Sequence, residues 1–154
     1  MRFPEIGTHF FRLKLLQLQK KFDFDLWQVT VGYPLGVYAA DFFKKRSIPC
    51  VLRCTGEDIQ LDHAVNYGYR KSPHVDHLIR SNYPKYDGFV ALTESVRTEY
   101  LKLHIPEKKI RIIPNGVSLM RFPRNMEKEV LKRQLGLENK KILLTVGRNH
   151  PKKG

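Results

Sequence analysis

The stretch that decides the fold is residues 26–59, LWQVTVGYPLGVYAADFFKKRSIPCVLRCTGEDI. Residues 26–31 are mostly apolar and predict a short strand. Pro34 then stands where a helix can begin, and residues 35–46 follow with three cations in the last turn, where positive charge complements the helix dipole. Residues 49–54 predict a second strand. This order of strand, helix and strand is the unit from which parallel sheets are built.

The same alternation continues on both sides of that stretch. Upstream, Phe11, Leu15, Leu18 and Phe22 recur at helical spacing and predict a helix, although residues 11–15 also fit a strand. Residues downstream predict a loop with one helical turn at 59–72, helices at 73–83, 93–104 and 125–135, and strands at 88–92, 110–113 and 142–146. The predicted fold class is therefore α/β, a Rossmann-like parallel sheet with helices on both faces.

Helix boundaries carry specific signals. Ser72 followed by Pro73 is typical of a helix start, and Thr93 and Asn125 are candidate N-caps. Gly136 is a candidate stop for the helix at 125–135.

Length and composition narrow the class of protein. The chain has 154 residues, 42% hydrophobic and 28% charged, which fits a folded domain rather than a disordered tail. No apolar run reaches the length of a membrane span, and the first residues lack the apolar segment of a secretion signal. We therefore expect a cytoplasmic protein.

Charge is concentrated in the second half. Residues 1–96 hold 13 basic and 10 acidic side chains, net +3, whereas residues 97–154 hold 15 basic and 5 acidic, net +10. Such a basic half favours anionic partners, namely nucleic acid, a phospholipid surface or a phosphate-bearing small molecule.

The spacing of the cysteines and histidines matches no metal-binding motif. Cys50 and Cys54 would lie on one face of a strand, about 13 Å apart, too far for a disulfide, so we expect free buried thiols. His63, His74 and His77 match no metal-ligand spacing, and we expect neither a metal nor another cofactor.

Polar turns follow the predicted strands, where ligands of parallel sheets bind. Gly32 and Tyr33 follow the first strand, and Thr55, Gly56, Glu57 and Asp58 follow the second. Glycine lets a backbone approach a ligand and a carboxylate accepts sugar hydroxyls, although an ordinary turn capped by Asp58 explains the same residues. The C-terminal segment 147–154, GRNHPKKG, is either an anion site or a solvated basic terminus.

Taken together, three segments resemble the family 4 glycosyltransferases, which have the two-domain GT-B fold. Residues 25–59 resemble that family's strand, helix, strand and HG-x-D turn, here with Thr55 in place of the histidine. Residues 87–123 resemble its D-x-hydrophobic-x-A-x-S and IPNGVD-x-x-x-F segments, here with Ser118 in place of the aspartate. Residues 142–154 resemble the first strand and GR-x-x-x-x-KG turn of its second domain.

The resemblance implies a retaining transfer of sugar from a nucleotide-diphospho sugar to a saccharide or lipid-linked acceptor, without a metal. It assigns Arg148 and Lys153 to the donor diphosphate, with Lys152 as a neighbour able to substitute. It makes Gly32, Thr55, Gly56, Asp58, Asn115 and Gly116 candidates for sugar or acceptor contacts. It assigns no catalytic residue.

The resemblance also implies a division into an acceptor-side domain at 1–120, without its first strands, and a linker helix with the start of the donor domain at 121–154. The glycine-rich loop near the family's N-terminus has no counterpart, and we expect the donor domain's E-x7-E element to lie beyond residue 154. We therefore expect a fragment that is inactive alone, because half a cleft cannot hold donor and acceptor together. Whether the chain is itself an enzyme stays open.

Other interpretations of the sequence remain. The basic half can dock on an anionic membrane at its inner face. It can also bind nucleic acid, although no RNA-binding or helix-turn-helix motif supports this. A non-catalytic interaction protein is a further alternative, in which an uncovered strand binds a chain carrying the rest of the enzyme.

Overall fold

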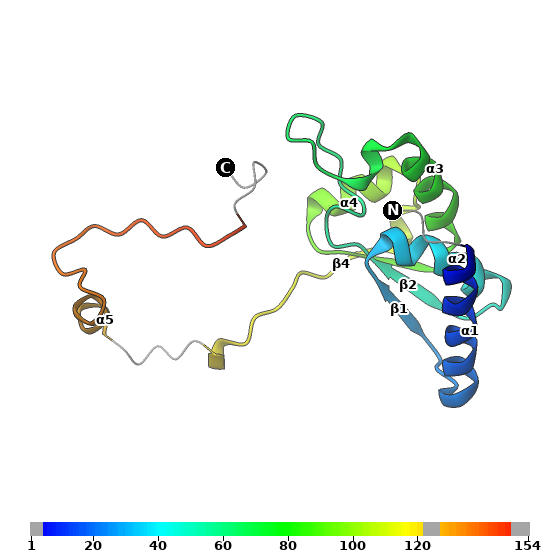
Figure 1. Ribbon diagram of the computed structural model, residues 1–154, viewed down its shortest axis with the longest axis horizontal. Coiled ribbons are helices and arrows are strands. Elements are labelled where there is room, and N and C mark those ends of the chain that lie inside the picture. The colour runs from blue at the N-terminus through cyan, green and yellow to red at the C-terminus, as the bar shows by residue number, and fades with distance from the viewer. Residues whose placement is uncertain (1–4, 122–126, 149–154) are drawn as a thin grey trace. The chain divides into compact units, whose positions relative to one another are not determined.

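The computed structural model describes residues 5–121 and 127–148. The chain divides into two compact units, Met1–Pro114 and Asn115–Gly154, each described here by itself (Figure 1). Whether these units correspond to the acceptor and donor parts at 1–120 and 121–154 stays a prediction.

The first unit is built on a four-stranded parallel sheet. Its strands are β1 (Trp27–Thr30), β2 (Cys50–Arg53), β3 (Gly88–Ala91) and β4 (Ile110–Ile112), and each pairs with the next in the order of the sequence. The α/β class and the Rossmann-like parallel sheet are thus confirmed, as are the strands predicted between residues 26 and 113.

Four helices of the described residues cover this sheet: α1 (Glu5–Phe22), α2 (Val37–Lys45), α3 (Pro73–Asn82) and α4 (Glu94–Lys102). A π-helical turn, Gly32–Gly36, leads into α2. Because successive parallel strands are joined by right-handed crossovers, the sequential strand order places α2, α3 and α4 on one face. Gln28, Thr30 and Arg111 point to the other face and are exposed. Whether helices also cover that face, as the sequence predicts, stays a prediction.

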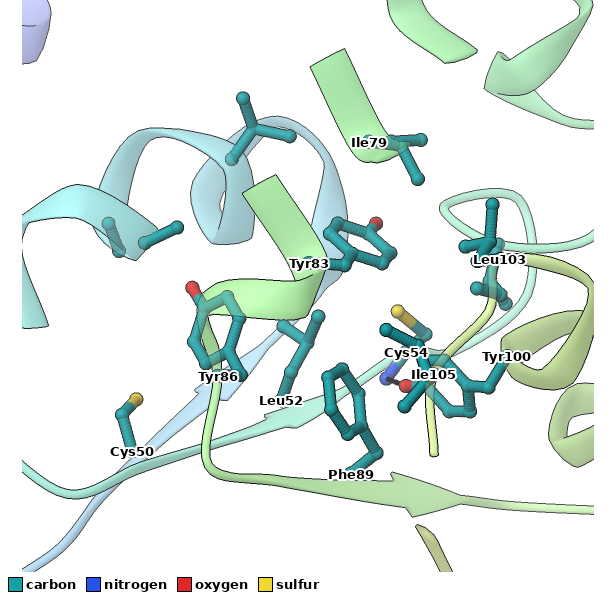
Figure 2. Close-up of a cluster of buried hydrophobic side chains, with 14 of the residues drawn as sticks. Cys50, Leu52, Cys54, Ile79, Tyr83, Tyr86, Phe89, Tyr100, Leu103 and Ile105 are labelled. Carbon is teal, nitrogen blue, oxygen red and sulfur yellow. Dashed lines mark hydrogen bonds between the residues drawn. The ribbon is translucent and has the colours of Figure 1, made fainter. Parts of the chain in front are cut away.

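The core lies between the sheet and its helices. Leu52 and Phe89 point from the central strands toward Ile79 of α3 and Tyr100 of α4 (Figure 2). Tyr100 packs on the Phe89 ring at 5.0 Å between centroids. Cys50 and Cys54 are buried and free, as expected. Burial, with the nearby charge of Asp87 second, raises the pKa of Cys50 to about 12, so this thiol stays protonated.

Predicted helix boundaries are largely confirmed. Thr93 caps α4, because its hydroxyl oxygen accepts the backbone N–H of Val96 at 3.3 Å. Pro73 is the first residue of α3, although Ser72 makes no side-chain cap bond. Gly136 ends α5 (Lys128–Gln134) with a φ of +63°, the left-handed region that favours glycine. The proposed cap Asn125 lies outside the described residues.

The second unit has helix α5, a short 3-10 turn at Leu119–Arg121, and no buried side chain among its described residues. Residues 142–146, expected to be a strand, form extended chain that pairs with no strand in the described structure. A strand exists only where a neighbour takes its backbone hydrogen bonds, and the described part of this unit offers none. Among the helices in the described ranges, none combines the length and apolar character needed to cross a membrane.

Candidate functional site

The turn after β2 is tied to the end of β1 by one buried carboxylate. Asp58 is 2% exposed, and its Oδ2 accepts the backbone N–H of Gly32 at 2.6 Å. Its Oδ1 accepts the N–H groups of Thr55 and Gly56 at 2.9 and 2.8 Å. Charge-assisted bonds of this kind are about twice as strong as neutral ones. Asp58 therefore sets the relative position of the two strand ends.

Gly32 is required by this close approach. A Cβ at this position would lie 2.0 Å from the phenol oxygen of Tyr83, deep in the core. The same Tyr83 hydroxyl donates to the Asp58 carbonyl oxygen at 2.7 Å, so it cannot move without losing a buried hydrogen bond.

A cavity of about 550 Å³ opens beside these strand ends. This is within the range of small-molecule sites, about 300–1,000 Å³. The rings of Tyr33 and Tyr69 lie 5.5 Å apart and inclined at 53°. Apolar and polar groups share the wall, which is lined by Tyr33, Pro34, Glu57, Asn66, Gly68, Tyr69, Lys71, Ser72 and Val75.

The two tyrosines present neutral hydroxyls. Burial raises the pKa of Tyr33, with the charge of Tyr38 second. Burial also raises the pKa of Tyr69, helped by the charge of Glu57 and by the hydrogen bond between the two side chains. Both phenols stay protonated at neutral pH, so they can donate as well as accept. Tyr69 and Glu57 together give the wall a polar pair next to an aromatic surface.

The loop that carries much of this wall is closed on itself at the cavity's edge. Asp62 and Tyr67 form an isolated antiparallel bridge. Lys71 Nζ donates to the backbone oxygen and the side-chain oxygen of Asn66, at 2.6 and 2.7 Å. This cation is therefore held in place at the cavity by two neutral acceptors.

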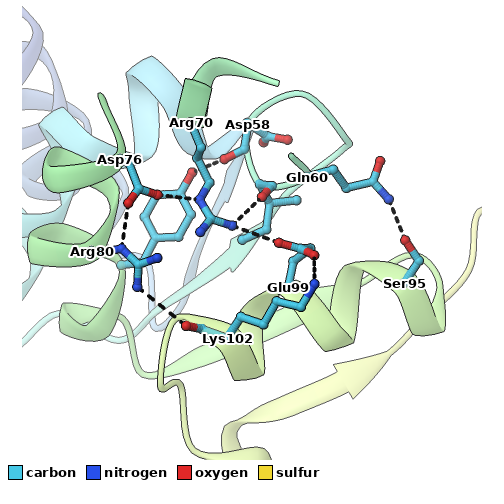
Figure 3. A network of polar contacts seen from close by, with 10 residues as sticks. Asp58, Gln60, Arg70, Asp76, Arg80, Ser95, Glu99 and Lys102 are labelled. Atoms are coloured by element: carbon cyan, nitrogen blue, oxygen red, sulfur yellow. Dashed lines mark hydrogen bonds and ion pairs between the residues drawn. The ribbon is translucent and has the colours of Figure 1, made fainter. Parts of the chain in front are cut away.

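A buried arginine fixes the same loop to two helices (Figure 3). Arg70 Nη1 donates to the carbonyl oxygen of Ile59 and to Glu99 of α4, both at 2.9 Å, and its Nε donates to Asp76 of α3 at 2.7 Å. Arg80 Nε donates to the second oxygen of Asp76 at 2.6 Å. Burial acts to raise the pKa of Asp76, but these two arginines outweigh it and lower the pKa.

Four of the predicted contact residues gather at the strand ends. Gly32, Gly56 and Asp58 are buried there, and Thr55 is exposed. Both carboxylate oxygens of Asp58 accept hydrogen bonds from backbone N–H groups. The cavity wall is formed instead by residues next to these in the chain, including Tyr33 and Glu57.

The remaining predicted residues belong to the second unit or lie outside the described ranges. Asn115, Gly116 and Arg148 are exposed in the second unit. Lys152 and Lys153 lie outside the described residues. In the part of the chain that the structure describes, no cluster of His, Cys, Asp and Glu is arranged to hold a metal.

Sequence reasoning missed Tyr69 and Lys71, and it placed Tyr33 in a turn at a strand end without assigning it a contact. The signal for Tyr33 was present, because an aromatic residue directly follows Gly32 at a strand end. No signal joined it to Tyr69, since only the fold brings together residues so far apart in sequence.

Comparison with known families identifies the chain. The model of Glycosyltransferase Family 4 matches residues 2–121, which include the whole sheet and the cavity. The chain belongs to glycosyltransferase family 4. A search among curated proteins gives no match. Family membership indicates a glycosyltransferase-type function, with sugars in general as substrates.

Proposed function

We propose that the cavity binds the acceptor saccharide of a sugar-transfer reaction. The observation that carries this proposal is the pairing of Tyr33 and Tyr69 with Glu57 at the carboxyl ends of β1 and β2, in a family 4 chain. Aromatic faces pack against the apolar face of a pyranose ring, and a carboxylate accepts its hydroxyls.

In this proposal the donor is a nucleotide-diphospho sugar, and transfer proceeds with retention at the anomeric carbon. Arg148 and Lys153 would neutralise the leaving diphosphate, with Lys152 able to substitute. Fixed cations stabilise the charge that grows on the leaving group as the glycosidic bond breaks. Asn115, Gly116 and the exposed Thr55 remain candidates for contacts to the sugars.

The 154-residue chain by itself is proposed to be inactive. Transfer requires donor and acceptor to be held together with water excluded. The described residues of the second unit bury no side chain, so they offer no preorganised donor site of their own. A separate chain with the rest of a donor domain is a proposed partner, supported by the exposed apolar segment 142–146.

The acceptor is proposed to be a saccharide or a lipid-linked saccharide at the cytoplasmic face of a membrane. The net charge of +10 over residues 97–154 supports attraction to anionic lipid. Vesicle binding that is equal for neutral and anionic lipid at low salt would contradict this part of the proposal.

Saccharide binding tests the central claim. We expect a panel of mono- and disaccharides to give saturable heats in titration calorimetry, and Tyr69→Ala to weaken the best ligand at least tenfold. Phe24→Ala is the matched control, because Phe24 is 43% and Tyr69 45% exposed while Phe24 lies outside the cavity. Equal affinity of Tyr69→Ala and wild type, with both folded, would contradict the cavity as the saccharide site.

Transfer itself needs a second assay. Release of nucleotide diphosphate from UDP-, GDP- or ADP-sugars is expected only when a chain with a complete donor domain is added. Turnover by the pure 154-residue chain would overturn the proposed dependence on further residues.

A further inference from the structure

The outward side of α1 combines exposed apolar and basic side chains. Phe10 is 67% exposed and Leu13 47% exposed. Helical spacing places them on the same face as Lys14, Gln17, Lys20 and Lys21, all of which are exposed. These six residues are called the α1 stripe. Leu15, Phe11 and Leu16 occupy the opposite side and pack against the core, so the stripe faces away from the first unit, at whose margin α1 lies (Figure 1).

Among the described residues of the first unit, five of the nine large exposed hydrophobic side chains lie on this helix or directly after it. Phe22, Phe24 and Leu26, directly after the α1 stripe, are also exposed. Phe22 stacks on Phe24 with ring centroids 5.3 Å apart, so the two rings form one apolar surface. Clustered exposed apolar side chains mark interaction sites, whereas single ones do not.

The charge of the stripe is positive along the helix. Lys14 Nζ donates to Gln17 at 3.1 Å, and Lys21 Nζ lies 5.0 Å from the centre of the Phe22 ring. Among the described residues, the ion pairs formed by α1 involve only Arg12, which turns inward to Asp41. The exposed carboxylates of Asp23 and Asp25 follow the end of the helix. The positively charged surface therefore ends where α1 ends.

This combination fits an anionic phospholipid surface. Apolar side chains enter the acyl boundary while lysines extend their ammonium groups to the headgroups. A nucleic acid backbone would use the lysines but would leave Phe10 and Leu13 in water. A symmetric pair of copies would place lysines against lysines, which disfavours self-association.

We propose that the α1 stripe docks the first unit on an anionic phospholipid bilayer, with Phe10 and Leu13 inserted and Lys14, Lys20 and Lys21 on the headgroups. This inference rests on the proposed membrane location of the acceptor and extends it to a surface of the cavity-bearing unit. It is separate from the proposed attraction of the basic second unit, because it involves other residues and includes the insertion of Phe10 and Leu13, which salt does not screen.

Vesicle co-sedimentation of the full chain tests the proposal. Phosphatidylcholine vesicles are compared with vesicles that also contain phosphatidylglycerol, at low and physiological salt. Phe10→Ser combined with Leu13→Ser is expected to weaken binding to anionic vesicles by about tenfold or more, and to remove the fraction that persists at physiological salt. The control, Leu119→Ser with Met120→Ser, removes two exposed apolar side chains from the second unit and is expected to bind as wild type does.

Lysine variants test the electrostatic part. Lys20→Gln with Lys21→Gln is expected to weaken binding about fivefold per lysine at low salt. Lys140→Gln with Lys141→Gln removes the same charge from exposed positions of the second unit. A smaller loss is expected there, because the proposal places no side chain of the second unit in the bilayer.

Several outcomes would overturn the proposal. They are wild-type vesicle binding by the Phe10/Leu13 variant, equal binding to neutral and anionic vesicles, and a dimer in sedimentation velocity that the same variant abolishes. Displacement from vesicles by duplex DNA with loss of DNA binding in the Phe10/Leu13 variant would assign the stripe to nucleic acid instead.

Saccharide titration of that variant separates the two proposals, since docking can fail while the cavity still binds sugar. All of the substituted side chains are exposed, so a circular dichroism melt should match wild type.

Discussion

Strand β2 and segment 142–146 have similar apolar compositions and opposite surroundings. Leu52, at the centre of β2, is 0% exposed, whereas Leu143 is 101% exposed. β2 pairs with β1 on one side and β3 on the other, and its inward residues are covered by helices. Segment 142–146 has no such neighbours in the described structure. Apolar, β-branched sequence makes a strand possible, and the neighbours decide whether it forms.

The largest expected contrast is between Leu52→Ala and Leu143→Ala. Leu52→Ala should lower the free energy of unfolding by about 3 kcal/mol, because it leaves a cavity in a packed core. Leu143→Ala should change it by less than about 0.5 kcal/mol, because an exposed side chain loses no contacts. Urea unfolding followed by the fluorescence of Trp27, the only tryptophan, measures both. Trp27 reports on the first unit, since it packs on Phe43 of α2.

A large loss in Leu143→Ala would contradict this contrast and would show that segment 142–146 packs on the first unit in solution. A far-UV circular dichroism melt of the same variant separates that result from a local effect on tryptophan fluorescence. Retention of full stability by Leu52→Ala would contradict the position of the core.

The next contrast concerns two aspartates near the cavity. Asp58→Asn places an amide N–H₂ group against a backbone N–H and removes the charge that strengthens three hydrogen bonds, so a loss of about 2–3 kcal/mol is expected. Asp62→Asn is the control, because the Asp62 side chain accepts the exposed backbone N–H of Ala64 at 3.1 Å, and an asparagine oxygen can keep this bond. Similar unfolding midpoints for the two variants would show that Asp58 does not join the strand ends.

Much of the first unit could be predicted from its sequence because its signals are local. The Thr93 cap of α4 and the Pro73 start of α3 each depend on residues within one turn of a helix. Asp58 was predicted as a candidate ligand contact, but its carboxylate is bound by the N–H of Gly32, which lies 26 positions away. No local pattern contains that partner.

The pairing of Tyr33 with Tyr69 in the cavity wall was missed for the same reason. Tyr33 and Tyr69 meet because β1 and β2 are adjacent and the loop after β2 folds back over their ends. The predicted strand at 142–146 was wrong for the described residues, because a strand requires a neighbouring strand that a single segment does not encode.

Acid titration sharpens the comparison between the units. The pKa of Asp76 is lowered in the fold by Arg70 and Arg80, so this carboxylate stabilises the protein above its ordinary pKa near 4. The contribution is lost as the pH falls through the lower, folded value. Asp76→Asn should therefore cost about 1.5 kcal/mol at pH 7 and progressively less in acid. Glu138→Gln, at an exposed position of the second unit, should leave the free energy of unfolding unchanged both at pH 7 and in acid.

Urea midpoints measured from about pH 7 to pH 3 give the result. A constant difference between wild type and Asp76→Asn would show that the carboxylate acts only by packing. An increasing difference toward low pH would contradict the direction of the shift.

The smallest expected contrast is between the N-cap residues of two helices. Thr93 caps α4 through a side-chain bond to the N–H of Val96, whereas Glu127, at the same position before α5, makes no side-chain cap bond. Thr93→Ala should cost about 1 kcal/mol, and Thr93→Ser should restore most of it, because the hydroxyl rather than the methyl group satisfies the N–H. Glu127→Ala should change the urea midpoint by less than the error of the measurement. A cost for Glu127→Ala equal to that for Thr93→Ala would mean that α5 contributes to the cooperative unit that contains the sheet, and that the two units unfold together.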